Sequence, residues 1–190
     1  MKELTEFWVD QPRDAVKMWD SWRDPHRGQV VQAIGLLDVG TVYEVGCGSG
    51  PNLRLLRDYF PKMYLSGSEP NQGLREHCRK YFQCDDLTLP DIPVNKSYDC
   101  VLSVYTLAYV ENIEPVFSGF YDNGTKYMVL VEPSAGIYPF DKPGLYQGHA
   151  MTSYVHDYAR LAGYYGWKIE YRWPIIPHYQ GLNCTLILTR

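Results

Sequence analysis

One acidic residue and three glycines stand close enough together in the sequence to form a binding site for a small ligand. Glu44 precedes Gly46, Gly48 and Gly50, which occupy every second position. Glycine has no Cβ, so the backbone can turn sharply here and approach a ligand closely. An acid two residues before the first glycine would repel a phosphate group and attract an ammonium group. These residues therefore favour a ligand with an ammonium group over a pyrophosphate.

The segments around the glycines predict a strand, a turn and a helix. Residues 41–45 are rich in β-branched and aromatic side chains, which are typical of a buried strand. Pro51 follows the last glycine, where its missing N–H costs little in the first turn of a helix over about 51–59. The spacing GxGxG differs from the GxGxxG fingerprint of dinucleotide sites. The backbone N–H groups at the start of this helix would point at a ligand over the turn.

A second acid follows at the end of the next predicted strand. Residues 63–70 form this strand, which ends at Glu69, and Asn71 is a plausible N-cap for a helix over 71–81. In a parallel sheet the carboxyl ends of neighbouring strands meet at one edge. An acid at this position can accept hydrogen bonds from both hydroxyls of a ribose that lies over these strands. We therefore expect Glu69 to bind ribose.

The segment EVGCGSG (44–50) resembles the first motif of class I S-adenosylmethionine-dependent methyltransferases. Its continuation through FPKMYLSGSEPN (60–71) is similar to small-molecule methyltransferases of that superfamily. The resemblance implies an α/β fold, a Rossmann-like seven-stranded mostly parallel sheet with helices on both faces and an antiparallel last strand. It also implies that S-adenosyl-L-methionine is the cofactor, with the glycine turn under its methionine portion and Glu44 facing its amino group.

The resemblance also assigns the adenine end of the cofactor to the third strand, expected over 81–84. An Asp at this strand end would accept from the adenine amino group, and both Asp85 and Asp86 are candidates, with Asp86 and an apolar contact from Leu87 favoured. The expected cofactor residues are Glu44, Gly46, Cys47, Gly48, Gly50, Asn52, Glu69, Pro70, Asp85, Asp86, Leu87, Ser103 and Val104.

Candidates for catalysis lie after the fourth strand, expected over 98–104, and in the loop 134–152. Tyr105 and Tyr109 follow the strand, where the resembled family places residues that face the substrate. Many relatives have a histidine at the position of Tyr109, so an obvious general base is missing there. Tyr109 could position an acceptor, lie against the sulfonium or be a core residue. His149 is the best single candidate for a general base, although a structural role remains open.

Composition limits the classes of partner and compartment. The chain has 190 residues, a net charge of -4 and no basic run, which weighs against a nucleic acid held by electrostatic attraction. No apolar run is long enough to span a bilayer, and the first residues lack the apolar core of a signal peptide. We therefore expect a cytoplasmic protein with no membrane partner. The five cysteines form no CxxC pair and no short-spaced group with histidines, so we expect reduced thiols and no metal site.

The remaining patterns fit a single domain over residues 1–190. It divides into N-terminal helices (1–40), a cofactor-binding half (41–135), and a substrate-side loop with closing strands (136–190). The first helix is rich in aromatic residues and is either core packing or a lid, and Arg27 could meet the cofactor's carboxylate. The further expected elements are helices over 14–22, 27–37 and 153–163, the last with Ser153 as N-cap, and strands over 126–131, 168–172 and 184–189.

These observations predict a methyltransferase that acts on a small-molecule acceptor, whose identity the sequence does not give. The motifs typical of methylation at nucleobase amines are absent after the fourth strand. Two alternatives stay open. An NAD-dependent oxidoreductase would bind NAD and not S-adenosylhomocysteine. A non-catalytic protein that binds S-adenosylmethionine or a partner would show cofactor affinity without turnover.

Overall fold

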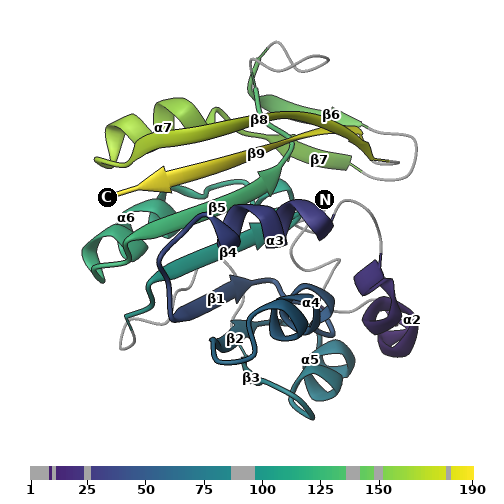
Figure 1. Cartoon of the computed structure of the whole chain (residues 1–190). Helices are drawn as coiled ribbons and strands as arrows, with labels where there is room; N and C mark the ends of the chain where they lie inside the picture. The colour runs from purple at the N-terminus through teal and green to yellow at the C-terminus, as the bar shows by residue number, and fades with distance from the viewer. Residues whose placement is uncertain are drawn as a thin grey trace.

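Seven strands form one sheet at the centre of the molecule (Figure 1). The computed structural model describes residues 9, 12–23, 27–86, 97–135, 142–147, 152–178 and 181–190. The strands of this sheet are β1 (Thr41–Val45), β2 (Tyr64–Ser68), β3 (Gln83–Asp85), β4 (Cys100–Val104), β5 (Tyr127–Glu132), β8 (Lys168–His178) and β9 (Gly181–Thr189). Their order is β3-β2-β1-β4-β5-β9-β8. Pairs among β1 to β5 are parallel, and β9 is antiparallel to both of its neighbours. The expected fold class is confirmed.

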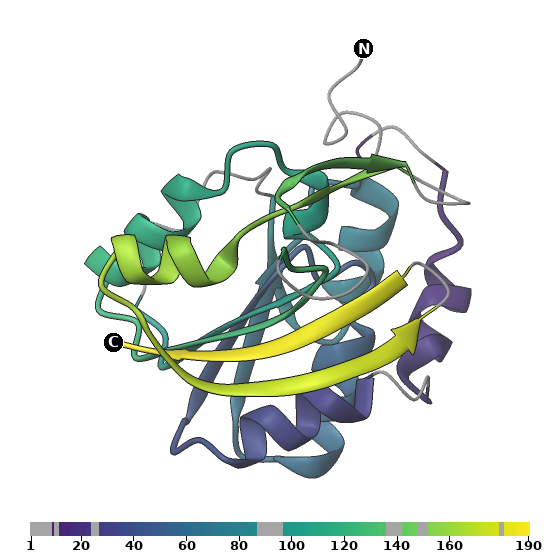
Figure 2. The ribbon, with the colours of Figure 1, turned by 90° about the horizontal axis from the view of Figure 1, so that it is seen from above.

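Helices cover both faces of the sheet. The helices are α2 (Ala15–Asp20), η1 (Ser21–Arg23), α3 (Gly28–Gly35), α4 (Pro51–Tyr59), α5 (Gln72–Cys78), η3 (Leu107–Tyr109), α6 (Glu114–Asp122) and α7 (Tyr158–Tyr164). One core cluster packs α3, α4 and α5 against the sheet, and a second packs α6 and α7 against the other face. Figure 2 shows these two helical layers from above. No helix in the described ranges is long and apolar enough to cross a bilayer.

The cofactor-binding half follows the sequence prediction closely. The strand at 41–45 and the helix at 51–59 have the expected bounds. Gly50 adopts a left-handed conformation immediately before Pro51, so the chain can change direction between strand and helix. Asn71 caps α5 as expected, since its side chain accepts a hydrogen bond from the Leu74 N–H. The third strand begins two residues later than expected, because Tyr81 lies in a turn.

The second half departs from the prediction at three places. The expected helix over 153–163 is wrong at its start, because residues 152–155 form strand β7, and α7 begins at Tyr158 with Asp157 as N-cap. The loop expected over 134–152 contains strand β6 (Gly144–Gln147), which pairs with β7 (Thr152–Val155). Strands β8 and β9 extend into the segment expected to join them. Because β8 is the outermost strand, its prolines interrupt fewer backbone hydrogen bonds than they would in a central strand.

The carboxylate of Asp99 links the strands at the amino-terminal edge of the sheet, opposite the glycine turn. Asp99 Oδ2 accepts hydrogen bonds from the N–H groups of Gly40 and Thr41 at 2.9 and 3.0 Å. Its Oδ1 accepts from Lys126 Nζ at 2.8 Å. The hydrogen bond and charge of Lys126 lower the pKa of Asp99 to about 2. The side chain thus links the residues that begin β1, β4 and β5, and it fixes the relative position of the strands that carry the site.

Candidate active site

The glycine turn after β1 has a backbone that other residues would adopt only under strain. Gly46, Gly48 and Gly50 have φ values of 65°, 58° and 95°. A Cβ at Gly46 would lie 2.3 Å from Cγ2 of Thr106, and one at Gly48 would lie 2.5 Å from the Met18 sulfur. The turn is therefore packed closely by the loop after β4 on one side and by α2 on the other. Both the φ angles and the lack of space account for the three glycines.

Glu44 presents a buried carboxylate at this turn. The side chain is 1% exposed, and its Oε1 accepts a hydrogen bond of 2.6 Å from Asn52 Nδ2. Its Oε2 has no hydrogen-bond partner among the described residues. Burial raises the pKa of Glu44 from 4.5 to about 8, although Asn52 and the charge of Arg27 oppose the shift. A buried carboxylate oxygen without a partner is costly unless a ligand satisfies it, and an ammonium group would do so.

Arg27 reaches the same region through Asn52. Its Nη1 donates to Asn52 Oδ1 at 2.6 Å, while Nε and Nη2 donate to the carbonyl and hydroxyl oxygens of Ser21. Asn52 therefore bridges a cation and the acid Glu44. This arrangement fixes the amide so that its NH₂ group faces Glu44, and it leaves the second carboxylate oxygen for another donor.

Glu69 lies directly after β2 and is bonded to the glycine turn. Its Oε2 accepts from the Gly48 N–H at 2.9 Å, and its Oε1 accepts from the Asn71 N–H at 2.8 Å. Arg75 Nη1 supports the backbone here by donating to the carbonyl oxygens of Glu69 and Pro70 at 2.8 and 2.7 Å. Burial raises the pKa of Glu69 to about 7. Each carboxylate oxygen can accept a further hydrogen bond, which suits a pair of ligand hydroxyls.

The two acids proposed for adenine have different surroundings. Asp85 ends β3, and its Oδ2 accepts a long hydrogen bond of 3.4 Å from the Tyr43 hydroxyl. Asp86 is 63% exposed and forms an ion pair of 2.9 Å with Arg75. Leu87 lies outside the described residues. Which of the two acids would meet an adenine amino group stays a prediction.

A buried glutamate shapes the loop that follows β4. Glu132, at the end of β5, accepts hydrogen bonds at its Oε1 from the Ser103 hydroxyl and from the N–H groups of Thr106 and Leu107, at 2.7, 2.8 and 3.1 Å. Burial raises the pKa of Glu132 to about 7. Tyr105 has a φ of 53° within this loop, a conformation that costs a non-glycine residue about 1–3 kcal/mol. The bonds to Glu132 on both sides of Tyr105 hold it in this conformation.

Two of the three proposed catalytic residues, Tyr105 and Tyr109, lie at this loop. Tyr109 ends η3, next to the segment held by Glu132, whereas His149 lies outside the described residues. The sequence analysis did not select His156. Its Nε2 lies 3.1 and 2.9 Å from the carbonyl oxygens of Leu107 and Val110 and thus donates to them, and burial lowers its pKa. These contacts fix the ring of His156 beside η3.

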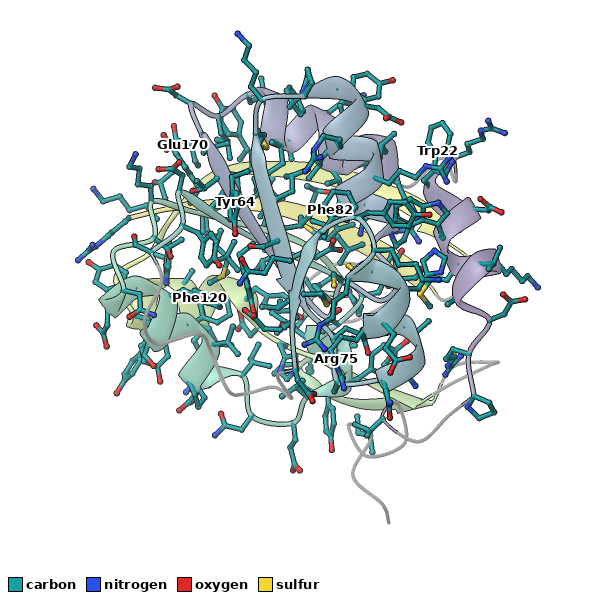
Figure 3. The ribbon with its side chains drawn as sticks, turned by 90° about the horizontal axis from the view of Figure 1, so that it is seen from below. Trp22, Tyr64, Arg75, Phe82, Phe120 and Glu170 are labelled. Atoms are coloured by element: carbon teal, nitrogen blue, oxygen red, sulfur yellow. The ribbon has the colours of Figure 1, made fainter. Side chains whose placement is uncertain are left out.

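Helix α2 covers the outer side of the glycine turn. Besides the approach of Met18 to Gly48, Trp19 stacks on Tyr81 with ring centroids 4.4 Å apart. Arg54 lies over the Trp19 ring at 5.0 Å. These contacts fix α2 against α4 and the end of α5. Figure 3 shows Trp22, which follows α2, at the periphery of the molecule. Whether this helix opens as a lid stays a prediction.

The other residues expected at the cofactor have structural contacts of their own. The hydroxyl of Ser103 bonds to Glu132, and Val104 is the last residue of β4. The Cys47 thiol lies 3.8 and 3.4 Å from the sulfurs of Cys78 and Cys84. These residues lie at or under the site, and their contact with a cofactor stays a prediction.

Three features of the site are not predicted from the sequence, and only the first two have a weak signal there. Glu132 follows a continuous apolar run, and an acid at the end of such a strand could have been recognised as a buried group. Gly67 lies inside a strand, where glycine marks the close approach of another chain segment; a Cβ there would lie 2.6 Å from the Glu44 carbonyl oxygen. The bridge from Arg27 through Asn52 to Glu44 joins residues far apart in the sequence, so no local pattern could reveal it.

Comparisons with known proteins agree with this fold. Residues 43–122 match the family model described as a methyltransferase domain. Similar solved structures include an S-adenosylmethionine-dependent methyltransferase from Mesorhizobium loti, with 13% identity, 89% of this chain and 100% of that chain covered, and a TM-score of 0.70. A magnesium protoporphyrin IX methyltransferase from Synechocystis, with bound S-adenosylmethionine, has 15% identity, coverage of 95% and 85%, and a TM-score of 0.60. A sugar N-methyltransferase from a Streptoalloteichus species has 12% identity, coverage of 95% and 94%, and a TM-score of 0.66. Comparison with curated proteins found no match.

The site fits the cofactor of these proteins on its own geometry. The three glycines add no side chain of their own to the turn, although Thr106 and Met18 pack against it. Glu44 has an oxygen without a partner for an ammonium group, and Glu69 can accept from two hydroxyls. The family match covers the turn and both acids, and the sheet continues beyond it in the order found above. Residues 43–122 therefore match a methyltransferase domain, and the fold of the chain is that of solved S-adenosylmethionine-dependent methyltransferases.

Proposed function

We propose that this methyltransferase transfers a methyl group to a small organic acceptor and that Glu44 and Glu69 divide the recognition of S-adenosyl-L-methionine between them. The observation that carries the proposal is the pair of buried carboxyls on either side of the glycine turn, one with an oxygen that lacks a partner. Two buried acids so close to each other are costly in the absence of a cationic, hydroxyl-bearing ligand.

The role of each acid follows from its contacts. Glu44 would accept from the ammonium group of the cofactor's methionine portion, because Asn52 already occupies its other oxygen. Glu69 would accept from the ribose hydroxyls while the Gly48 and Asn71 N–H groups keep its carboxylate fixed. Asp85 or Asp86 would complete the adenine end. The binding of a cation beside Glu44 favours its ionised form, so cofactor binding and deprotonation of Glu44 support each other.

The proposed class of acceptor follows from how little catalytic chemistry the protein itself must supply. When bound, S-adenosylmethionine provides a methyl carbon that its positive sulfur already activates. The chain would align the acceptor with that carbon and exclude water, a role for the loop held by Glu132 and for Tyr105 and Tyr109. An amine or a carboxylate needs no strong general base. The net charge of -4 and the small-molecule substrates named for similar structures support a small acceptor over a nucleic acid.

Calorimetric titration with S-adenosylhomocysteine tests the cofactor site directly. We expect saturable binding to the wild-type chain and no binding of NAD. Glu69→Gln should weaken binding by about 10-fold to 100-fold, because a hydrogen bond to a charged group is worth about 1.5–3 kcal/mol. Glu76→Gln is the matched control, since Glu76 is an exposed acid on the neighbouring helix. Equal affinities for wild type and Glu69→Gln, or binding of NAD, would contradict the proposal.

The pH dependence of the same titration separates Glu44 from Glu69. Binding should strengthen as pH rises through the Glu44 pKa of about 8, because the carboxylate is the form that accepts from an ammonium group. Glu44→Gln should remove this part of the dependence. The acceptor can then be sought by incubating the chain with isotopically methyl-labelled cofactor and panels of small amines, carboxylates and alcohols, and by following the label by mass spectrometry. Labelling of nucleic acid and not of small molecules would refute the acceptor class.

A further inference from the structure

Three cysteines that lie far apart in the sequence meet beneath the glycine turn. The sulfur of Cys47 lies 3.4 Å from that of Cys84 and 3.8 Å from that of Cys78, and all three sulfurs lie within 4.8 Å of one another. The three side chains are buried, with exposures of 3%, 0% and 3% for Cys47, Cys78 and Cys84. The sequence spacing gave no reason to expect such a group, because the three cysteines come together only in the folded chain.

Two glycines make the room that this thiol cluster occupies. A Cβ at Gly67 would lie 3.0 Å from the Cys47 sulfur, and a Cβ at Gly50 would lie 3.2 Å from the Cys78 sulfur. Trp19 lies against the same side, since its ring would be 3.4 Å from the Gly50 Cβ. A ligand could therefore reach the cluster by displacing this tryptophan, without unfolding the sheet.

Two arginines place positive charge beside the cluster. The charges of Arg79 and Arg75 both act on Cys84. Arg79 Nε also donates to the Cys84 carbonyl oxygen at 2.7 Å, which fixes its guanidinium beside the cluster. Figure 3 views this side of the molecule and labels Arg75. Thiolates are the form in which cysteine binds metals.

The spacing of the sulfurs suits a metal ion. An ion bound about 2.3 Å from each sulfur holds the sulfurs about 3.8–4.0 Å apart, which is close to the two shorter separations found here. Structural zinc almost always takes four ligands, whereas this cluster offers three within the described chain. Thiolate ligands in a buried apolar place select soft ions, of which Cu(I) is the first-row example. We propose that Cys47, Cys78 and Cys84 form a buried three-sulfur site for a soft cation of the Cu(I) type.

Occupation of this site would affect the cofactor side of the sheet. Cys47 lies within the glycine turn, Cys84 immediately precedes Asp85, and Cys78 ends the helix that Asn71 begins. A metal bound to all three would fix the turn, β3 and α5 relative to one another. Because the turn also bonds to Glu69, metal occupancy and cofactor affinity are coupled, and each changes the other by the same factor.

The test uses the full chain, reduced and kept free of oxygen. Cu(I) is titrated in competition with a chromophoric chelator, and we expect one ion per chain. Cys78→Ala and Cys84→Ala should each weaken binding by about 100-fold or more, since each removes a direct ligand. The double variant Cys100→Ala with Cys184→Ala is the matched control, because both thiols are buried elsewhere in the sheet. Retention of Cu(I) by the control and its loss from the single variants would support the site.

A second measurement does not depend on any variant being folded. X-ray absorption of the wild-type chain loaded with one Cu(I) should show three sulfur neighbours. Two sulfur neighbours, nitrogen or oxygen neighbours, or unchanged affinity in folded Cys78→Ala would each overturn the proposal. None of these readouts depends on the proposed acceptor or on activity, so failure here leaves the methyltransferase function untouched.

Discussion

Replacement of Gly46 by alanine is the sharpest test of why the turn has its shape. An L-residue at a φ of 65° costs about 1–2 kcal/mol. The new methyl group would also lie 2.3–2.9 Å from the side-chain atoms of Thr106, and such overpacking costs about 1–3 kcal/mol. The two contributions together predict that Gly46→Ala lowers the free energy of unfolding by about 2–5 kcal/mol. That is a large part of the total stability of a typical domain.

The two causes can be separated by a double-variant cycle. Thr106→Ala removes the two atoms nearest to the new methyl group and leaves the Thr106 Cβ, 2.9 Å from it. It also removes the hydroxyl bonds to the Gly46 and Val104 carbonyls, both 3.3 Å long. In the double variant most of the steric part should be recovered and the φ part should remain, giving a coupling energy of about 1–3 kcal/mol. Gly163→Ala is the control, since no atom lies near its Cβ position in α7 and alanine is the better helix former by about 1 kcal/mol.

Urea unfolding followed by circular dichroism gives the unfolding midpoint of the wild-type chain and of the four variants. With a denaturant slope of about 2 kcal/mol per molar, the midpoint of Gly46→Ala should fall by about 1–2.5 M. Titration with S-adenosylhomocysteine of the folded variant should show weakened binding as well. A Gly46→Ala chain with the wild-type midpoint, or a double variant no more stable than the sum of the single changes predicts, would refute the packing that we describe.

Three further outcomes follow from the buried acids and from the edge of the sheet. Burial raises the pKa values of Glu44, Glu69 and Glu132 from 4.5 to about 8, 7 and 7, so these groups favour folding below about pH 4.5, and this contribution is lost as pH rises through 7–8. Urea midpoints should therefore fall as pH rises from about 4.5 toward 8, and they should fall less steeply with pH in Glu44→Gln. A pH dependence of the midpoint equal to that of wild type would contradict the assignment. Glu132→Ala should lower the free energy of unfolding by at least about 3 kcal/mol, because it leaves several buried donors without an acceptor. A thermal unfolding midpoint equal to that of wild type would contradict this. Asp99→Ala should lower the free energy of unfolding by about 1–3 kcal/mol, and Lys126→Ala by less, because Lys126 is exposed; equal effects measured in urea would contradict the backbone role of Asp99.

Local signals explain why the first half of the chain could be predicted. The glycines, Pro51 and Asn71 act on the backbone at their own positions, so β1, α4 and the start of α5 follow from the sequence. The same locality made Glu44 and Glu69 recognisable, because each directly precedes or follows a predicted strand end. The resemblance to methyltransferases then supplied the seven-stranded, mostly parallel sheet with an antiparallel last strand, which no local pattern contains.

The errors lie where pairing between distant residues decides the structure. Ser153 has the chemistry of an N-cap, but residues 152–155 pair with 144–147, and Asp157 caps the helix instead. Strand β8 contains prolines, which argue against a strand unless it lies at the edge of the sheet, and its edge position follows only from the tertiary fold. The thiol cluster and the contacts of Glu132 likewise depend on three-dimensional packing of separate elements.

The antiparallel insertion of β9 between β5 and β8 also sets an order on assembly. Until β9 is available, β5 has an unpaired edge of backbone N–H and C=O groups, and its apolar residues lack cover on that side. The partner comes from the far end of the described chain, so the loop that must close is long and the step is slow. During synthesis the glycine turn and β1 to β5 would emerge well before this pairing is possible. The edge of β5 is therefore where a nascent chain is most exposed to aggregation and where a chaperone has most to protect.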